Sequence, residues 1–130
     1  KTAGQGEDAL EMQFLNACNT TLSITNSEFR RYRTYGIQIQ TLNTSTTTAT
    51  ITNNQVLQDA GIPGQGIELT GSGTSSVNYT VNNNTVNYRN GNGIGILTIA
   101  NATSNGKIIG NNITGPGADI TGIGIRVGAE

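Results

Sequence analysis

Two short patterns alternate along the chain, and this repeat constrains the fold more than any other feature. The first pattern has four residues: a small residue, an aliphatic residue, any residue and a second aliphatic residue. It occurs at 9–12, 36–39, 66–69, 93–96 and 122–125. The second is an aliphatic residue, two polar or small residues, Asn or Ser, any residue and an apolar residue. It occurs at 24–29, 51–56, 81–86 and 108–113.

The spacing of the two patterns is regular. The last aliphatic residue of the first pattern always lies 12 residues before the first aliphatic residue of the second, as from Met12 to Ile24. The return segments differ in length, since the one from Val56 to Gly66 is longer than the one from Phe29 to Gly36. Variable length is typical of exposed loops, so the return segment is the predicted loop of each repeat.

Alternating apolar and polar residues over a few positions predict short strands with one buried face. The 130 residues include 20 Thr, 18 Gly and 17 Asn, which disfavour helix interiors. The period of the repeat, about 27 to 30 residues without a helix, is the length of one coil of a parallel β-helix, in which each strand pairs with its counterpart one coil along. We therefore predict an all-β solenoid of about four and a half coils.

Stacking of like residues predicts three kinds of column. Aliphatic residues form ladders inside, and a column at Ser27, Asn54, Asn84 and Asn111 falls at a turn, where Asn tolerates left-handed backbone and stacks its amides. One predicted outward column is Glu11, Gln38, Glu68, Gly95 and Gly124. Its neighbour is Gln13, Gln40, Thr70, Leu97 and Arg126.

The repeats that read Ile-x-x-Asn-x-Val and Gly-Ile-x-Ile resemble the right-handed parallel β-helix repeats of large secreted bacterial surface proteins, and more distantly those of pectate-lyase-like proteins. The resemblance extends from Ala9 to Val127. It implies a right-handed parallel β-helix and an extracellular or cell-surface location. Because this fold serves adhesins, matrix proteins, polysaccharide lyases, glycosidases and phage tailspikes alike, it implies little about activity.

We expect residues 1–130 to form a single domain, with coils that start near 9, 36, 66, 93 and 122, and to be a fragment or repeat unit of a longer or assembled structure. Its end rungs would leave apolar residues and unpaired backbone uncovered. These end-rung residues are Leu10, Met12 and Phe14 at one end and Ile123, Ile125 and Val127 at the other. The predicted partner is therefore a second copy stacked end to end, or a flanking β-helix of the same chain.

Composition excludes several kinds of site. The chain has no His, no Trp and one Cys, which rules out a Ser-His-Asp or Cys-His site, a zinc site with His ligands and an internal disulfide. We expect no metal and no cofactor. A net charge of -1 disfavours nucleic-acid partners, and the chain lacks an apolar run long enough for membrane insertion.

Two groups of residues are candidate binding sites. Glu11 and Glu68 would lie two rungs apart, near the upper limit for the carboxyl pair of an inverting glycosidase, or they belong to a solvated polar ladder. A basic and aromatic group suits an acidic polysaccharide or an acidic partner surface, or it merely covers the core edge. Its members are Arg30, Arg31, Tyr32, Arg33, Tyr35, Tyr88 and Arg89.

Six Asn-x-Ser/Thr sequences are candidate glycosylation sites. They begin at Asn19, Asn43, Asn78, Asn83, Asn101 and Asn112.

These observations favour a non-enzymatic structural module: a stalk, an adhesin segment or a self-assembling fibre subunit. The alternative is a β-helix that binds or degrades a polysaccharide. A third hypothesis is a decorative repeat within a larger protein.

Overall fold

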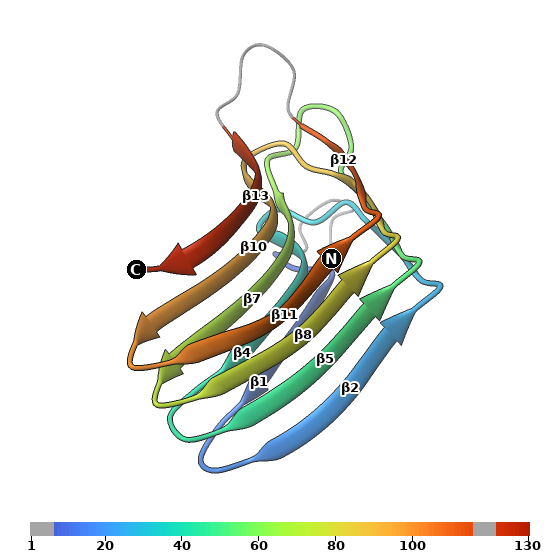
Figure 1. Cartoon of the computed structure of the whole chain (residues 1–130). Helices are drawn as coiled ribbons and strands as arrows, with labels where there is room; N and C mark the ends of the chain where they lie inside the picture. Colours follow the sequence, from blue (N-terminus) through green and yellow to red (C-terminus); the bar gives the residue numbers. More distant parts are fainter. Residues whose placement is uncertain (1–6, 116–121) are drawn as a thin grey trace.

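The computed structural model describes residues 7–115 and 122–130, which form a parallel β-solenoid of about four turns (Figure 1). Sheet 1 contains β1 (Leu10–Phe14), β4 (Tyr35–Thr41), β7 (Gln65–Gly73), β10 (Gly91–Ala100) and β13 (Gly122–Ala129). Sheet 2 contains β2 (Asn19–Thr25), β5 (Thr46–Thr52), β8 (Ser76–Asn82) and β11 (Thr103–Ile109). Sheet 3 contains β3 (Glu28–Arg30), β6 (Gln55–Leu57), β9 (Thr85–Asn87) and β12 (Asn112–Thr114).

The chain visits the three sheets in the same order in every turn. Each strand pairs in parallel with its counterpart one turn along, and the register places Leu10 beside Ile37, Ile37 beside Ile67 and Ile67 beside Ile94. These offsets equal the first three spacings of the repeat. The predicted all-β parallel solenoid is thus confirmed, and the described residues contain no helix.

The last strand departs from the predicted register by two residues. Ile94 pairs with Ile125 rather than with Ile123, and Ile96 pairs with Val127 rather than with Ile125. The sequence Gly-Ile-Gly-Ile-Arg-Val satisfies the first pattern at Gly122 and again at Gly124, and a shift of two residues keeps every side chain on the same face. In the first outward column Arg126 therefore follows Gly95, and in the second Gly128 follows Leu97.

Close backbone packing explains the glycine at the start of the first pattern. A Cβ on Gly93 would lie 2.6 Å from the carbonyl oxygen of Gly124, and one on Gly66 would lie 2.2 Å from that of Gly93. The small residue of the first pattern thus lets consecutive turns approach closely, and Gly124 continues this glycine column.

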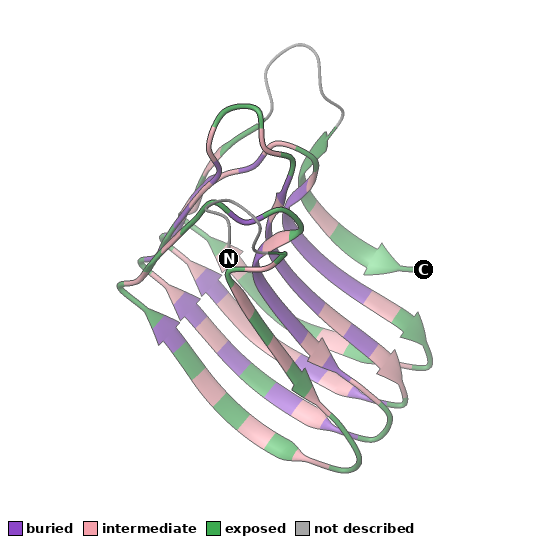
Figure 2. Cartoon of the chain, turned by 180° about the vertical axis from the view of Figure 1, so that it is seen from behind, coloured by how far each residue is buried: buried purple, intermediate pink, exposed green. Residues whose placement is uncertain are grey.

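The core consists of stacked aliphatic residues from all three sheets. Ile37, Ile39, Ile67, Leu69, Ile94 and Ile96 of sheet 1 are completely buried, as are Ile51 and Val81 of sheet 2 and Val56 and Val86 of sheet 3. Burial is densest in the middle turns and falls toward both ends (Figure 2). The predicted internal ladders of Ile, Leu and Val are present.

The turn between sheets 2 and 3 uses two adjacent residues for different purposes. Asn26, Asn53, Asn83 and Gly110 take the left-handed backbone, with φ between 52° and 64°. The next residue in each turn belongs to the predicted Asn column, whose side chains stack inside. The sequence predicts left-handed backbone and amide stacking at the same position. In the structure the first residue of the turn has the left-handed backbone and the second residue stacks its amide.

Hydrogen bonds run continuously along this Asn ladder. The backbone N and Nδ2 of Asn54 both donate to Oδ1 of Asn84, at 2.9 and 3.0 Å, and Asn84 donates in the same way to Asn111, at 2.9 Å for both bonds. Nδ2 of Asn84 also donates to the carbonyl oxygen of Ile51, at 2.9 Å. Each amide therefore satisfies buried groups of two neighbouring turns.

We expect Asn84→Ala to lower the free energy of unfolding by about 2 to 4 kcal/mol, because each buried group left without a partner costs about 1–3 kcal/mol. Urea denaturation measures the loss. Asn112→Ala is the matched control: Asn112 is exposed one rung away, and the expected change stays within about 0.5 kcal/mol. Equal losses in both variants would contradict a structural role for the ladder.

Candidate functional site

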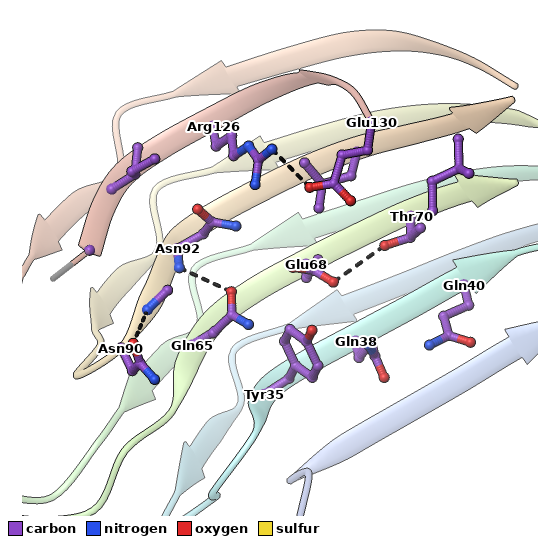
Figure 3. Close-up of a pocket in the computed structure, with 15 residues that line it drawn as sticks. Tyr35, Gln38, Gln40, Gln65, Glu68, Thr70, Asn90, Asn92, Arg126 and Glu130 are labelled. Atoms are coloured by element: carbon purple, nitrogen blue, oxygen red, sulfur yellow. Dashed lines mark hydrogen bonds and ion pairs between the residues drawn. The ribbon is translucent and has the colours of Figure 1, made fainter.

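An open groove of about 620 Å³ lies on the outer face of sheet 1, at the end nearer β13 (Figure 3). Amide, carboxyl and phenol groups dominate its lining, together with the apolar side chains of Leu97, Ile99 and Ile123. The polar lining residues labelled in Figure 3 are Tyr35, Gln38, Gln40, Gln65, Glu68, Thr70, Asn90, Asn92, Arg126 and Glu130.

Strand alternation and parallel pairing assemble this groove from distant parts of the sequence. Outward residues of β4, β7, β10 and β13 line up at the spacing between strands, about 4.8 Å. Nε2 of Gln13 donates to Oε1 of Gln40 at 2.8 Å, and the backbone N of Asn92 donates to Oε1 of Gln65 at 3.0 Å. The amides therefore form hydrogen bonds from turn to turn, which orders the groove wall.

Glu68 is the most enclosed charged group of the groove. It is 5% exposed although it points away from the core. Burial raises the pKa of Glu68 above its usual range, and the charge of Glu130 adds to this, while hydrogen bonds with Tyr35, Thr70 and Gln38 oppose it. The Thr70 hydroxyl donates to Oε1 of Glu68 at 3.3 Å. Glu68 thus takes up a proton at a higher pH than an exposed glutamate does.

Tyr35 lies against Glu68 at the start of β4. Burial, followed by the charge of Glu68, raises the pKa of Tyr35 to about 12. The phenol therefore keeps its proton at neutral pH and acts as a hydrogen-bond donor. At the rim nearest β13, Arg126 forms an ion pair of 2.8 Å with Glu130.

The structure brings Glu68, not Glu11, into the groove. Glu11 is exposed, accepts a hydrogen bond from Gln13 at 3.0 Å and does not line the groove. The second carboxyl group of the groove belongs to Glu130. Sequence reasoning placed Arg126 beside Leu97 and missed Glu130, because the predicted register of the last strand displaced both by two residues.

The basic and aromatic residues do not form one cluster. Tyr32 is 1% exposed and its hydroxyl donates to the carbonyl oxygen of Asn87 at 3.2 Å; Tyr88 is also buried. Tyr35 lines the groove instead. Neither the ring of Tyr32 nor that of Tyr88 has a face open to a ligand, so both rings cover the core edge.

The arginines of this group also lie apart. Arg30 is paired with Glu28, and Arg31 contacts Asp59 at 3.0 Å. Arg33 is exposed, and Arg89 lines a separate hollow of about 210 Å³ beside Ile62 and Pro63. Arg30, Arg31 and Arg33 are exposed, so they are the members of this group that an acidic partner can reach.

The six candidate glycosylation asparagines lie at the surface to different degrees. Asn19, Asn43, Asn83, Asn101 and Asn112 are exposed and Asn78 is half-buried. Nδ2 of Asn43, the atom that would carry a glycan, donates to Oδ1 of Asn16 at 3.0 Å.

The end-rung residues differ between the two ends. Leu10, Met12 and Phe14 on β1 are half-buried, whereas Ile123, Ile125 and Val127 on β13 are among the most exposed large apolar residues of the described chain. Within residues 7–115 and 122–130, no helix is long and apolar enough to cross a membrane. The same residues contain no group of three or more Asp, Glu, Cys or His that could hold a metal ion.

The raised pKa of Glu68 predicts a pH-dependent stability. Its contribution is fully present below the ordinary Glu pKa, near 4.5, and is lost as the pH rises through the higher folded-state pKa. We expect Glu68→Gln to raise the melting temperature at neutral pH and to flatten its pH dependence above 4.5, since Gln is buried without charge. Thermal unfolding at a series of pH values measures this. Glu11→Gln, at an exposed position of the same column, should leave the profile unchanged.

Comparison with protein-family models, with curated protein sequences and with solved structures found no match for this chain. The fold and the geometry of its surfaces therefore carry the argument about function.

Proposed function

We propose that this chain is a non-enzymatic structural module, a stiff β-solenoid segment that joins further β-solenoid coils through its end rungs. The extracellular or cell-surface setting of this proposal rests on the resemblance of the repeats to those of secreted bacterial surface proteins. In such a setting the segment would serve as a stalk, part of an adhesin or a fibre subunit.

The observation that carries the proposal is the exposed apolar row on β13. Ile125 and Val127 are 49% and 55% exposed, whereas Ile94 and Ile96, one rung earlier in the same columns, are completely buried. Burial of one such side chain is worth about 1.5–3 kcal/mol. A coil placed on β13 would therefore gain the same contacts that hold the internal turns together.

The shape of this end limits what fits on it. Sheet 1 has five strands and sheets 2 and 3 have four, so β13 stands one rung above β10 while β11 and β12 end the other two sheets. A complementary coil must first add a strand on β11, next one on β12, and then one on β13. In a second copy, β1 already occupies the place beside β4 that β13 would take, so β2 and β3 of that copy can pair with β11 and β12 only if β1 leaves β4.

We expect the purified chain to form assemblies that grow with concentration, and Ile125→Lys to reduce them strongly, because a charge would be buried at each junction. Sedimentation velocity at several concentrations and electron microscopy measure the change. Ile99→Lys is the matched control, since Ile99 is similarly exposed, at 39%, but lies on the side of the solenoid. A chain that stays monomeric at every concentration with full strand content would refute self-association.

The groove on sheet 1 favours carbohydrate binding as a second candidate function. Amides, a carboxyl group and a phenol can exchange hydrogen bonds with sugar hydroxyls, and apolar side chains lie beside them. Gly95 and Glu68 are neighbours in adjacent strands, and the Asn92 amide lies close to the place of a side chain on Gly95: a Cβ there would be 3.1 Å from Nδ2 of Asn92.

If the groove binds glycans, Gln40→Ala should weaken the binding of soluble oligosaccharides several-fold, as measured by calorimetry with neutral and acidic oligosaccharides. Gln55→Ala, an exposed Gln on sheet 3, is the control. Loss of binding to an acidic polysaccharide in Arg31→Ala, with Gln40→Ala unaffected, would place the glycan at the loops instead. No binding across the panel would remove this candidate.

A further inference from the structure

The outer face of sheet 2 is a regular, almost uncharged array. The strands β2, β5, β8 and β11 have seven residues each and pair without any shift, so their four outward positions form a grid of sixteen side chains. Eight are Thr, four are Asn and two are Ser; Lys107 and Ile109 on β11 complete the grid. The chain as a whole is 12% charged, and this face has one charge in sixteen positions.

The spacing of the grid is set by the backbone. Neighbouring rungs are about 4.8 Å apart, and outward residues along one strand are separated by about 6.6 Å. Thr is stiff at χ1, so its hydroxyl and methyl groups recur at nearly constant positions when Thr stacks on Thr. Figure 1 shows the four strands side by side at the front of the molecule. The face therefore presents hydroxyl, amide and methyl groups on a two-dimensional lattice.

A shallow trough of about 280 Å³ crosses β5, β8 and β11 on this face. One side is formed by Thr48, Asn78 and Asn105, and the other by Thr50, Thr80 and Lys107. Among the described residues, none of these six side chains has a hydrogen-bond partner within the protein. Their donors and acceptors are thus free for a row of water molecules at the rung spacing.

The chemistry of the grid narrows the choice of partner. An ionic ligand would require charges, and a polysaccharide platform or a protein interface typically supplies exposed aromatic residues or Arg. The sixteen positions contain no aromatic residue; Tyr79, which also lines the trough, lies between Asn78 and Thr80 and packs against the core. What remains is an uncharged partner that forms hydrogen bonds and repeats in two directions.

We propose that the outer face of sheet 2 binds ice. The hydroxyl and amide groups hold water in positions that continue into the crystal, and the Thr methyl groups exclude water that does not fit. On this proposal the two repeats of the grid, about 4.8 Å across the strands and about 6.6 Å along them, match repeats between oxygen atoms on a prism face of hexagonal ice. The outer face of sheet 2 also resembles an ice surface in carrying almost no charge.

Freezing-point hysteresis and ice shaping by the purified chain test this proposal, with recrystallisation inhibition as a second readout. Thr80→Tyr and Thr48→Tyr place bulky rings on opposite sides of the trough while keeping strand propensity. We expect hysteresis in the wild-type chain and its loss in both variants. Thr85→Tyr makes the same change on the outer face of sheet 3 and should leave the hysteresis unchanged. Circular dichroism identifies any variant that fails to fold.

Two results would overturn the proposal. One is a wild-type chain that neither shapes ice nor enters a growing ice front at millimolar concentration. The other is hysteresis that persists in both folded trough variants. Microcrystalline cellulose and chitin serve as competing lattices: binding to them without any effect on ice would assign the face to a polysaccharide surface and would also refute ice binding.

Discussion

Parallel pairing between each strand and its counterpart one turn along is the interaction on which the rest of the molecule depends. It places equivalent residues directly above one another, so a column is either inside or outside as a whole. A slip of one residue would reverse every column at once. Two further contacts fix the register: the glycine column, where turns approach closely, and the Asn ladder, whose amides bond to the turns on both sides.

The same stacking makes a column of like charges on an outer face unfavourable, because the charges would repel one another at each rung. The column Glu11, Gln38, Glu68, Gly95 and Arg126 avoids this by placing a neutral residue between charged ones. Glu68 is enclosed because Gln38 lies beside it on one side and its polar neighbours surround it. On the other side, Gly95 has no side chain, and the amide of Asn92 lies beside it. A rule that stabilises the fold thus also produces its most distinctive polar site.

The two ends of the solenoid and its three outer faces differ in chemistry. The ends continue the core, and their chemistry is that of buried rungs, as the exposed Ile125 and Val127 indicate. The outer face of each sheet consists of side chains that point away from the core. Each of the three sheets can therefore carry different functional groups. Sheet 1 carries amides and carboxyl groups, whereas sheet 2 carries Thr, Ser and Asn. Joining at the ends and binding on the sides are therefore compatible in one molecule.

The repeat by itself determined the fold class, the period, the aliphatic columns and the outward columns of the first four turns, because spacing in a solenoid translates directly into position. Only the tertiary structure decided the register of the last strand, since its sequence fits the pattern in two ways and a shift of two residues keeps the same side chains on each face. That choice brought Arg126 and Glu130 into the groove. The fate of Tyr32 and Tyr88 was likewise decided in three dimensions: loop sequence allows an aromatic ring to face solvent or core, and packing against neighbouring turns buried both.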